Sequence, residues 1–442
     1  MATEMEPTVE ERVLQLFQHL GIQQAHVAAR APADWQGLAA SHPERIASLT
    51  LVCPRALNTA SLGDLSPRLL VLASEQGPGA PLLRRTVEDL PQATLATLLG
   101  YRSGAASDLI AERGGEIGDK MLEFLSRMDR QRKVPAMFFP EARGEAAGIL
   151  YQIQGSGPPL VLFPLEFAPS QWDGLLTTFG EHYCTITLGG AHLGSVATLE
   201  ARGQGAYLDV LGRLVDEAQL EPGDKMLDVG CGTGVIDRWL AQRTNRANRI
   251  TAVDISTYLL REAAALARQA GLEEVIEFRE ASGESLPFPD HSFNVTLSCT
   301  VIQLVDADQM LAEMVRVTRP GGRVAVIARG DDRPNLINLQ LPGDLKARAE
   351  AHRGDSLVPQ GCADASLYRH FHQAGLTRVK MFPQLATHTD RSRLQTMQER
   401  ILPTLSPAEA REWRAAVAQA RAEGTFFISE LFHCAVGTKP VG

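Results

Sequence analysis

The sequence of 442 residues has few cysteines, and they are not grouped. No C-x-x-C pair occurs, and no histidines stand at the spacing of a zinc finger, so the sequence predicts neither a disulfide framework nor a zinc site. We therefore expect reduced thiols and no bound metal. The six cysteines stand singly at positions 53, 184, 231, 299, 362 and 434.

Long apolar runs and excess positive charge are also missing. No run is long enough to cross a membrane, and the acidic residues 1–11 have the pattern of neither a secretory nor a mitochondrial signal, so we expect a cytoplasmic protein. The net charge of -9 argues against the phosphate-backbone binding on which affinity for nucleic acid depends. A small-molecule substrate is therefore expected, and no nucleic acid.

What the sequence does have is a glycine-rich turn between an apolar strand, 225–229, and a helix, 235–243. Its glycines let the backbone turn sharply and come close to a ligand. A second apolar strand, 250–253, ends at Asp254, whose carboxylate can accept hydrogen bonds from both hydroxyls of a ribose. Together the two features predict a nucleoside pocket.

The residue before the first glycine indicates which nucleoside is bound. In the dinucleotide pattern G-x-G-x-x-G the backbone amides point at a pyrophosphate, whereas here Asp228 opens the run Asp-Val-Gly-Cys-Gly-Thr-Gly. A carboxylate at this place is unfavourable for a phosphate but suits the ammonium group of an amino acid. S-Adenosylmethionine joins such an ammonium group to a nucleoside, and it is the expected cofactor.

With this turn and two later motifs, the chain resembles the class I S-adenosylmethionine-dependent methyltransferases of the ubiquinone and menaquinone biosynthesis type. The later motifs are Leu-Pro-Phe-Pro-Asp-His-Ser-Phe-Asn-Val at 286–295 and Arg-Pro-Gly-Gly-Arg-Val at 319–324. The resemblance implies an α/β, Rossmann-like, seven-stranded domain over 199–442. Its last strand, 426–436, is expected to run antiparallel beside the sixth, 378–382.

The apolar periodicity predicts the other elements of this doubly wound domain. They are helices over 209–218, 256–270, 310–317 and 364–374, and strands over 275–278, 293–298 and 323–329. Two segments, 331–363 and 387–424, do not belong to the nucleoside fold; the second is expected to hold helices over 390–402 and 407–423. Because ligands bind beyond the carboxyl ends of strands, we expect these segments to cover the substrate, the alternative being surface decoration.

The resemblance also implies which residues form the site. Asp228 is expected to hold the methionine ammonium and Asp254 the ribose, while Ser282 replaces the family's usual Asp or Asn and makes the contact with the adenine amino group doubtful. Cys231 is interpreted as a small space-filler and not as a nucleophile. The expected cofactor-binding residues are Asp228, Gly230, Cys231, Gly232, Gly234, Asp254, Ile255, Ser282, Gly283 and Ser298, and the expected substrate-binding residues are Tyr207, Thr300 and Gln303.

Methyl transfer from a sulfonium displaces an activated leaving group in line, so a general base is optional and no catalytic residue is assigned. If the acceptor is a phenol or enol, the candidate bases are His192, Tyr207, His370 and His388, with none preferred. The expected reaction is C-, O- or N-methylation of a small, largely apolar or aromatic metabolite, as in secondary metabolism. The alternatives are a tRNA or protein methyltransferase and a non-catalytic scaffold that binds S-adenosylmethionine.

The region before residue 199 resembles, less specifically, two pieces of an α/β-hydrolase, 1–145 and 146–198, in reversed order. In the nucleophile elbow G-x-S-x-G, Arg30 stands where the serine should be, and Pro164 aligns with an oxyanion position although proline has no amide hydrogen. A plain α/β scaffold explains this region nearly as well. We expect a non-catalytic, hydrolase-like domain that packs, encloses substrate or mediates a homodimer; a working esterase would need the missing serine.

Overall fold

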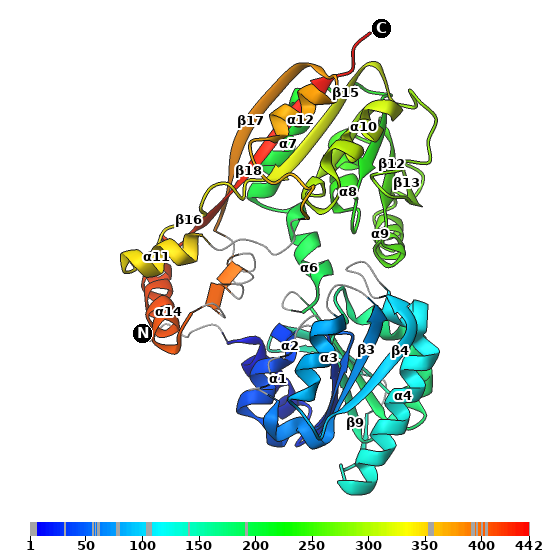
Figure 1. Ribbon diagram of the computed structural model, residues 1–442, viewed down its shortest axis with the longest axis vertical. Helices are drawn as coiled ribbons and strands as arrows, with labels where there is room; N and C mark the ends of the chain where they lie inside the picture. Colours follow the sequence, from blue (N-terminus) through cyan, green and yellow to red (C-terminus); the bar gives the residue numbers. More distant parts are fainter. Residues whose placement is uncertain are drawn as a thin grey trace. The chain divides into compact units, whose positions relative to one another are not determined.

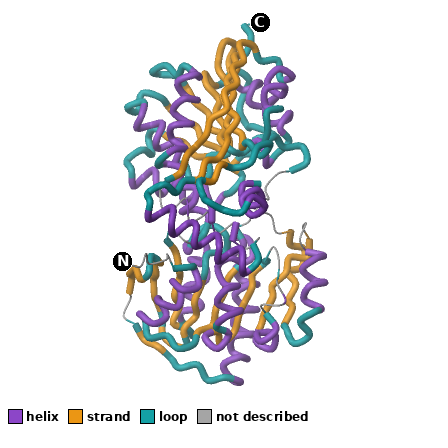
Figure 2. Tube along the Cα trace, turned by 90° about the vertical axis from the view of Figure 1, so that its left-hand side faces the viewer, coloured by secondary structure: helices purple, strands orange, loops and turns teal. Residues whose placement is uncertain are grey.

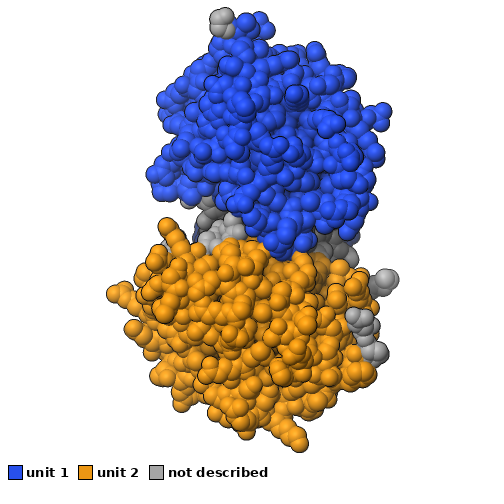
Figure 3. All heavy atoms as spheres, turned by 90° about the vertical axis from the view of Figure 1, so that its right-hand side faces the viewer, with its two compact units in different colours: residues 1–3, 199–442 blue, residues 4–198 orange. Residues whose placement is uncertain are grey.

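The chain divides into two compact units, residues 4–198 and residues 199–442, which Figure 3 distinguishes by colour. The division falls within helix α6 (Ser195–Glu200). None of the described helices has the length and apolar character needed to span a membrane. The structure is a computed structural model that describes residues 7–30, 32–54, 57, 59, 62–76, 80–102, 108–139, 142–190, 193–351, 358–389, 394, 397–398, 401–402 and 405–441.

Residues 4–198 form an α/β unit whose eight longer strands make one sheet in the order β4-β3-β2-β1-β9-β10-β7-β6. The strands from β4 to β10 are parallel to their neighbours, while β7 and β6 run antiparallel. The strands are β1 (Ala25–Ala29), β2 (Ile46–Val52), β3 (Leu69–Gln76), β4 (Thr94–Arg102), β6 (Ala142–Ala146), β7 (Ile149–Gln154), β9 (Pro159–Leu162) and β10 (Cys184–Gly189), with a separate pair of β5 (Met137–Phe138) and β8 (Ser156–Gly157). The helices are α1 (Val9–His19), α2 (Pro32–Ser41), α3 (Ala80–Glu88), α4 (Leu109–Gln131) and α5 (Asp173–Gly180).

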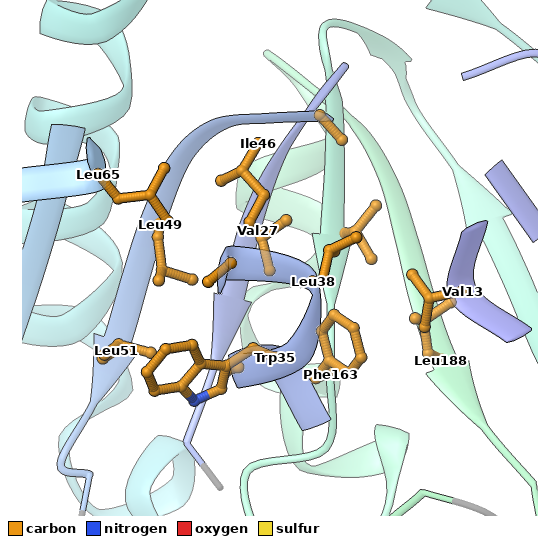
Figure 4. Packing of buried hydrophobic residues seen from close by; sticks show 14 of the residues in the cluster. Val13, Val27, Trp35, Leu38, Ile46, Leu49, Leu51, Leu65, Phe163 and Leu188 are labelled. Atoms are coloured by element: carbon orange, nitrogen blue, oxygen red, sulfur yellow. The ribbon is translucent and has the colours of Figure 1, made fainter. Parts of the chain in front are cut away.

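Helices cover both faces of this sheet, as the alternation of purple and orange elements in Figure 2 shows. One face packs against α1, α2 and α3 and the other against α4 and α5. Figure 4 shows Val27, Leu49 and Leu51 of the strands lying beside Trp35 and Leu38 of α2. Every residue of β1 and β2 is buried, as expected for parallel strands between two helix layers, although His26, Ser48 and Thr50 interrupt their apolar sequence.

Residues 199–442 form the doubly wound sheet that the sequence predicted, in the order β13-β12-β11-β14-β15-β18 with β17 on the other side of β18. The predicted antiparallel seventh strand is confirmed, since β18 runs antiparallel to both β15 and β17 (Figure 1). The strands are β11 (Lys225–Val229), β12 (Arg249–Asp254), β13 (Ile276–Glu280), β14 (Phe293–Cys299), β15 (Thr318–Arg329), β16 (Leu336–Ile337), β17 (Thr377–His388) and β18 (Ile428–Thr438). The helices are α7 (Ala206–Ala218), α8 (Val235–Arg243), α9 (Thr257–Gln269), α10 (Ala307–Val317), α11 (Gly343–Glu350), α12 (Leu367–Gln373) and α14 (Pro407–Ala422).

Two strands of this sheet extend well beyond their predicted bounds, and a third was not predicted. Strand β15 starts at Thr318 and not at 323. Thr318 pairs with Phe293 of β14 and Arg323 pairs with Val295, so residues 319–322 form a bulge in β15 between these two pairs. Strand β17 continues to His388 and not to 382, since it pairs along the whole of β18. The short strand β16 was not expected. The helix predicted over 390–402 lies mostly outside the described residues.

The two segments expected to cover the substrate pack against each other. Strand β16 pairs with Ser429 and Ile428 of β18, beyond the point where β15 ends at Arg329 opposite Phe432. The cover therefore lies past the carboxyl end of β15, which is the edge where ligands of such sheets bind. Its apolar cluster joins α11, α14 and β16 and contains Ile337, Leu339, Ala349, Leu394, Met397, Ile401, Trp413, Val417, Ala420, Phe426 and Ile428.

Candidate functional site

The glycine turn is anchored to the neighbouring strand and leaves no room for side chains. The amides of Gly230 and Cys231 both donate to the carbonyl of Val253 in β12, at 2.7 and 2.9 Å. Gly230 has a φ of +82°, and a Cβ there would lie 2.3 Å from the side chain of Val301. Gly234 has a φ of +69°, and a Cβ there would lie 2.8 Å from the ring of Phe278. Only glycine fits this backbone, which forms a cradle at the carboxyl end of β11.

Asp254 ties this turn to β12. Its carboxylate accepts a hydrogen bond from the amide of Gly232 and another from the amide of Ser256, each at 2.9 Å. Burial raises the pKa of Asp254, although these amides act in the opposite direction. A carboxylate has about four lone-pair positions, so hydrogen bonds from ribose hydroxyls can be added. Ile255 beside it is 58% exposed and offers an apolar surface next to the carboxylate.

Two buried carboxyl groups lie beside the same turn. Asp228 at the end of β11 is 2% exposed and Asp237 in the first turn of α8 is 0% exposed. By hydrogen-bond geometry none of their four oxygens has a partner. Burial, followed by the charge of Asp237, raises the pKa of Asp228 well above its usual value. Because an unsatisfied buried polar group costs about 1–3 kcal/mol, and more if it is charged, these oxygens indicate a place for a ligand.

Asp237 was missed by the sequence analysis, which considered only acids at strand ends. A signal was available, because Asp237 lies three and four residues before Leu240 and Ala241, which are both buried in the core. Residues at this spacing share one face of a helix. An acid on the inward face of the helix that follows a glycine turn is therefore a candidate site residue.

Further unpartnered atoms lie in buried residues of the same unit. Among the described residues they include the hydroxyls of Tyr207 and Thr233 and the amide oxygen of Gln303. The amide nitrogen of Gln303 donates to the carbonyl of Thr300 at 2.7 Å, and Arg202 donates to the hydroxyl of Thr300 at 2.9 Å. The Arg202 guanidinium also lies 5.7 Å from the ring centre of Tyr207. The three residues expected to bind substrate are therefore linked through Arg202.

The remaining predicted cofactor residues differ in what they can offer. Ser298 is fully buried, and its hydroxyl donates to the carbonyl of Val229 at 2.8 Å, so it joins β14 to β11 beside the glycine turn. The hydroxyl of Ser282 accepts from the amide of Glu284 at 3.2 Å. Gly283 lies beside Val229, close enough that a Cβ would stand 3.0 Å from its side chain. Burial raises the pKa of the Cys231 thiol, which supports its interpretation as a space-filler.

The candidate bases are not brought together. His192 lies outside the described residues. His370 on α12 pairs with Asp308 at 2.6 Å, near the helices on the opposite face of the sheet from Tyr207. His388 is buried, and its Nε2 lies 3.1 Å from a carboxylate oxygen of Glu430.

Of the candidate histidines that the structure describes, His370 and His388, only His388 shares a sheet face with Tyr207. Side chains alternate along a strand, so His388 lies on the face of Ala386 in β17, and Glu430 lies on that of Phe432 in β18. The rings of Phe432 and Tyr207 meet edge to face, with their centres 5.3 Å apart. A second buried histidine, which the sequence analysis did not consider, is His433; its Nε2 lies 2.8 Å from Asp332. No group of three metal-binding side chains occurs in the part of the chain that the structure describes.

Residues 4–198 also contain a Ser-His-Asp chain of hydrogen bonds, but not at a catalytic position. His26 Nδ1 lies 2.7 Å from the hydroxyl of Ser48, and its Nε2 lies 3.0 Å from Asp129. Ser48 and His26 are 0% exposed and lie toward the amino ends of β1 and β2. A substrate cannot reach this serine, so the arrangement is a buried polar network.

At the elbow position itself, the side chain of Arg30 is buried and held in place. It donates to the carbonyls of Cys53 and Leu165 at 3.2 and 3.3 Å and lies 4.0 Å from the carboxylate of Glu166. Arg30 is not among the residues with positive φ, so the strained turn that exposes a nucleophilic serine is absent here.

Comparison with known proteins agrees with this geometry. A family described as methyltransferase domain matches residues 227–326. The methyltransferase GfsG of Streptomyces halstedii is 36% identical over 115 residues, which are 26% of this chain and 41% of that protein. The ubiquinone/menaquinone biosynthesis C-methyltransferase UbiE of Hahella chejuensis is 28% identical over 186 residues, 42% of this chain and 69% of that protein. The solved YcgJ protein of Bacillus subtilis has a TM-score of 0.36 and 18% identity, covering 53% of this chain and 100% of that one.

Residues 199–442 therefore contain a class I methyltransferase domain, as the sequence predicted, and its cofactor is S-adenosylmethionine. More particularly, the domain is related to UbiE and GfsG. The part matched to GfsG spans less than half the length of that protein.

Proposed function

We propose that this protein transfers the methyl group of S-adenosylmethionine to a small, largely apolar acceptor. One observation carries the proposal: the oxygens of Asp228 and Asp237 are buried without partners beside a turn that only glycine can form. This arrangement fits a cationic amino-acid group close to a nucleoside. When bound, the cofactor supplies a methyl group on a sulfonium, which needs no further activation.

Residues at the carboxyl ends of β11, β12 and β13 each bind a different part of this cofactor. Asp228 accepts from the ammonium group, and Asp254 accepts from the ribose hydroxyls while its bonds to the turn fix its orientation. Ile255 covers one face of the adenine. The adenine edge then meets the segment of Ser282 and Gly283, where the serine is a shorter acceptor than the usual acid or amide.

The acceptor is placed beside Tyr207, Thr300 and Gln303, under the cover formed by α11 and α14. A contact between the cover and these residues supports this placement. Near the end of the first cover segment, 331–363, the amide of Val358 donates to the carbonyl of Gln303 at 3.1 Å. The cover is a cluster of apolar side chains, which favours an apolar acceptor and excludes water from the displacement. His388, held by Glu430, is the base that we prefer where the acceptor must lose a proton.

The experiment is transfer of tritium from labelled S-adenosylmethionine into a whole-cell extract, which is then separated into organic-soluble, protein and RNA fractions, followed by mass analysis of the product. The proposal expects label in an organic-soluble compound, and expects Asp254→Asn to lose most of this transfer. The matched control is Glu277→Gln, because Glu277 is an exposed strand acid paired with Arg279. Label in protein or tRNA instead would favour the other methyltransferases, and folded protein that binds S-adenosylhomocysteine but labels nothing would favour the scaffold.

For residues 4–198 we propose a non-catalytic, hydrolase-like domain. Support comes from the sheet, in which β9 of the second piece lies directly beside β1 of the first, so that pieces in reversed chain order complete one sheet. The buried Arg30 agrees with a lost active site. The Arg30→Ser variant is expected to hydrolyse p-nitrophenyl acetate no faster than wild type, and an acyl-enzyme burst would contradict this proposal. Whether this domain pairs two chains is tested by sedimentation of the intact protein.

A further inference from the structure

We propose that Asp237 is a second acidic residue of the ammonium subsite, that it shares a proton with Asp228 when no cofactor is bound, and that this proton is released when the ammonium group arrives. The inference rests on the proposed function, since it assumes that the cofactor binds at the glycine turn. It goes further by assigning a role to a residue outside the glycine turn and by making cofactor affinity depend on pH.

The geometry requires both acids to be considered together. Asp237 lies in the first turn of α8, directly after the turn that Asp228 precedes, and both side chains are at least 98% buried. None of their four oxygens has a hydrogen bond of ordinary geometry in the described part of the chain. Each carboxyl lies near enough to the other to influence its pKa as a hydrogen-bonding neighbour, and otherwise only the backbone at Val229 and at Asp237 acts in this way. A single acid at a helix amino terminus is ordinary, because the helix dipole favours it. Two neighbouring buried acids are not explained by the dipole alone.

Two like charges at close range in a dry site cannot both persist without a cation, so one proton held between them is the favourable state. Burial raises the pKa of both groups, that of Asp237 to about 7. The pair therefore holds a proton below neutral pH. An ammonium group supplies the missing positive charge and several donors, after which both carboxylates are stable without the proton.

The charged groups on the surrounding elements do not replace that cation. Asp254 on β12 adds to the negative charge felt by Asp228. Arg238 lowers the pKa of Asp237, but it is engaged by Glu200 at 2.6 Å. The other titratable groups near the pair are the thiols of Cys231 and Cys299, whose pKa values are raised by burial, and Arg202, which acts on Cys299 and donates to Thr300. The described groups around Asp228 and Asp237 therefore do not balance the negative charge of the two carboxylates.

The test is isothermal titration of the intact protein with S-adenosylhomocysteine, which carries the ammonium group, in two buffers of different ionisation enthalpy at pH 6, 7 and 8. The difference between buffers counts the protons released. We expect release of about one proton per ligand at pH 6 and much less at pH 8. Affinity should rise up to about tenfold per pH unit in the range where the pair still holds its proton.

Two comparisons separate the pair from other groups. 5′-Methylthioadenosine has the nucleoside without the amino-acid arm, so it should bind without releasing the proton. Asp237→Asn should bind S-adenosylhomocysteine with no proton release and a flat pH dependence. Asp216→Asn, which changes an exposed acid paired with Arg243, should behave as wild type.

The outcomes are distinguishable. If folded wild-type protein binds neither ligand, the proposed function fails and this inference fails with it. If S-adenosylhomocysteine binds with no proton release at pH 6, or methylthioadenosine releases as many protons, the cofactor assignment stands and the shared proton is wrong. Should Asp237→Asn fail to fold, the two ligands on wild-type protein still decide the question.

Discussion

Replacing Asp254 by asparagine separates the two tasks that its carboxylate performs. One oxygen accepts from the amide of Gly232 and the other from the amide of Ser256, both at 2.9 Å. The side chain of asparagine is the same size but has only one oxygen, and its NH2 group would face an amide donor. The variant therefore loses one bond that shapes the turn and the negative charge that receives the ribose.

The size of the effect follows from the kind of bond that is lost. A hydrogen bond to a charged acceptor contributes about 1.5–3 kcal/mol, so one such bond to the ribose corresponds to a roughly 10- to 150-fold weaker Kd for S-adenosylhomocysteine. The stability of the fold should change less. Because the folded pKa of Asp254 is raised by burial, the group favours folding most when it is protonated, and its charge at neutral pH opposes folding.

Calorimetric titration with S-adenosylhomocysteine measures the Kd, and thermal unfolding with circular dichroism measures the stability. Glu277→Gln changes an exposed acid of β13 in the same chemical way and should leave both quantities at the wild-type value. A folded Asp254→Asn protein that binds within twofold of wild type would refute the assignment of Asp254 to the ribose. Equal losses in both variants would mean that the net charge of the domain, and not a specific contact, controls binding.

Three further predictions use the same logic. Gly230→Ala should lower the midpoint of thermal unfolding, because residue 230 has a positive φ and the new Cβ would stand 2.3 Å from a methyl of Val301. In contrast, Gly212→Ala should raise the midpoint, because Gly212 lies in α7 with open space around it and alanine favours the helix. With the acceptor identified, His388→Gln should lower kcat while leaving KM for S-adenosylmethionine unchanged, and the same change at the exposed His372 should leave both constants at the wild-type value. Asp129 accepts from the hydroxyl of Tyr183 at 2.8 Å as well as facing His26; burial raises its pKa, but these hydrogen bonds outweigh burial and lower it. Asp129 therefore stabilises the fold above its unfolded pKa of about 3.9, and this contribution is lost on acidification. Asp129→Asn should flatten the acid unfolding curve measured by fluorescence below pH 4.

Much of residues 199–442 could be predicted because its signals are local. Alternating apolar runs define β11 and β12, and the glycines between β11 and α8 specify a turn that the structure reproduces with positive φ at Gly230, Gly232 and Gly234. The antiparallel last strand was available only through the resemblance, since no local pattern tells the direction of β18. Helix ends were correct within a few residues where a cap exists, as at Ser256 before α9.

What could not be predicted depends on partners that are distant in the chain. The hydrogen bond from the hydroxyl of Ser298 to the carbonyl of Val229 joins residues 69 positions apart, which no local pattern displays. The pairing of His388 with Glu430 follows from the register of β17 on β18, which a sequence does not display. In residues 4–198, β9 inserts between β1 and β10, and that order cannot be read from periodicity. In each case the missing information is a long-range pairing.

The charge of the site, more than its glycines, determines the class of ligand. A glycine turn before a helix suits a pyrophosphate as well as a nucleoside with an amino-acid arm, because both need close approach of backbone. Here the turn is bordered by Asp228, Asp237 and Asp254, while Arg238 pairs with Glu200 and Arg202 donates to Thr300. A pyrophosphate would add negative charge to three acids in a buried pocket, whereas a ligand with an ammonium and a sulfonium supplies the cations that this pocket does not have. The acids therefore select S-adenosylmethionine over a dinucleotide at a turn whose backbone alone does not decide between them.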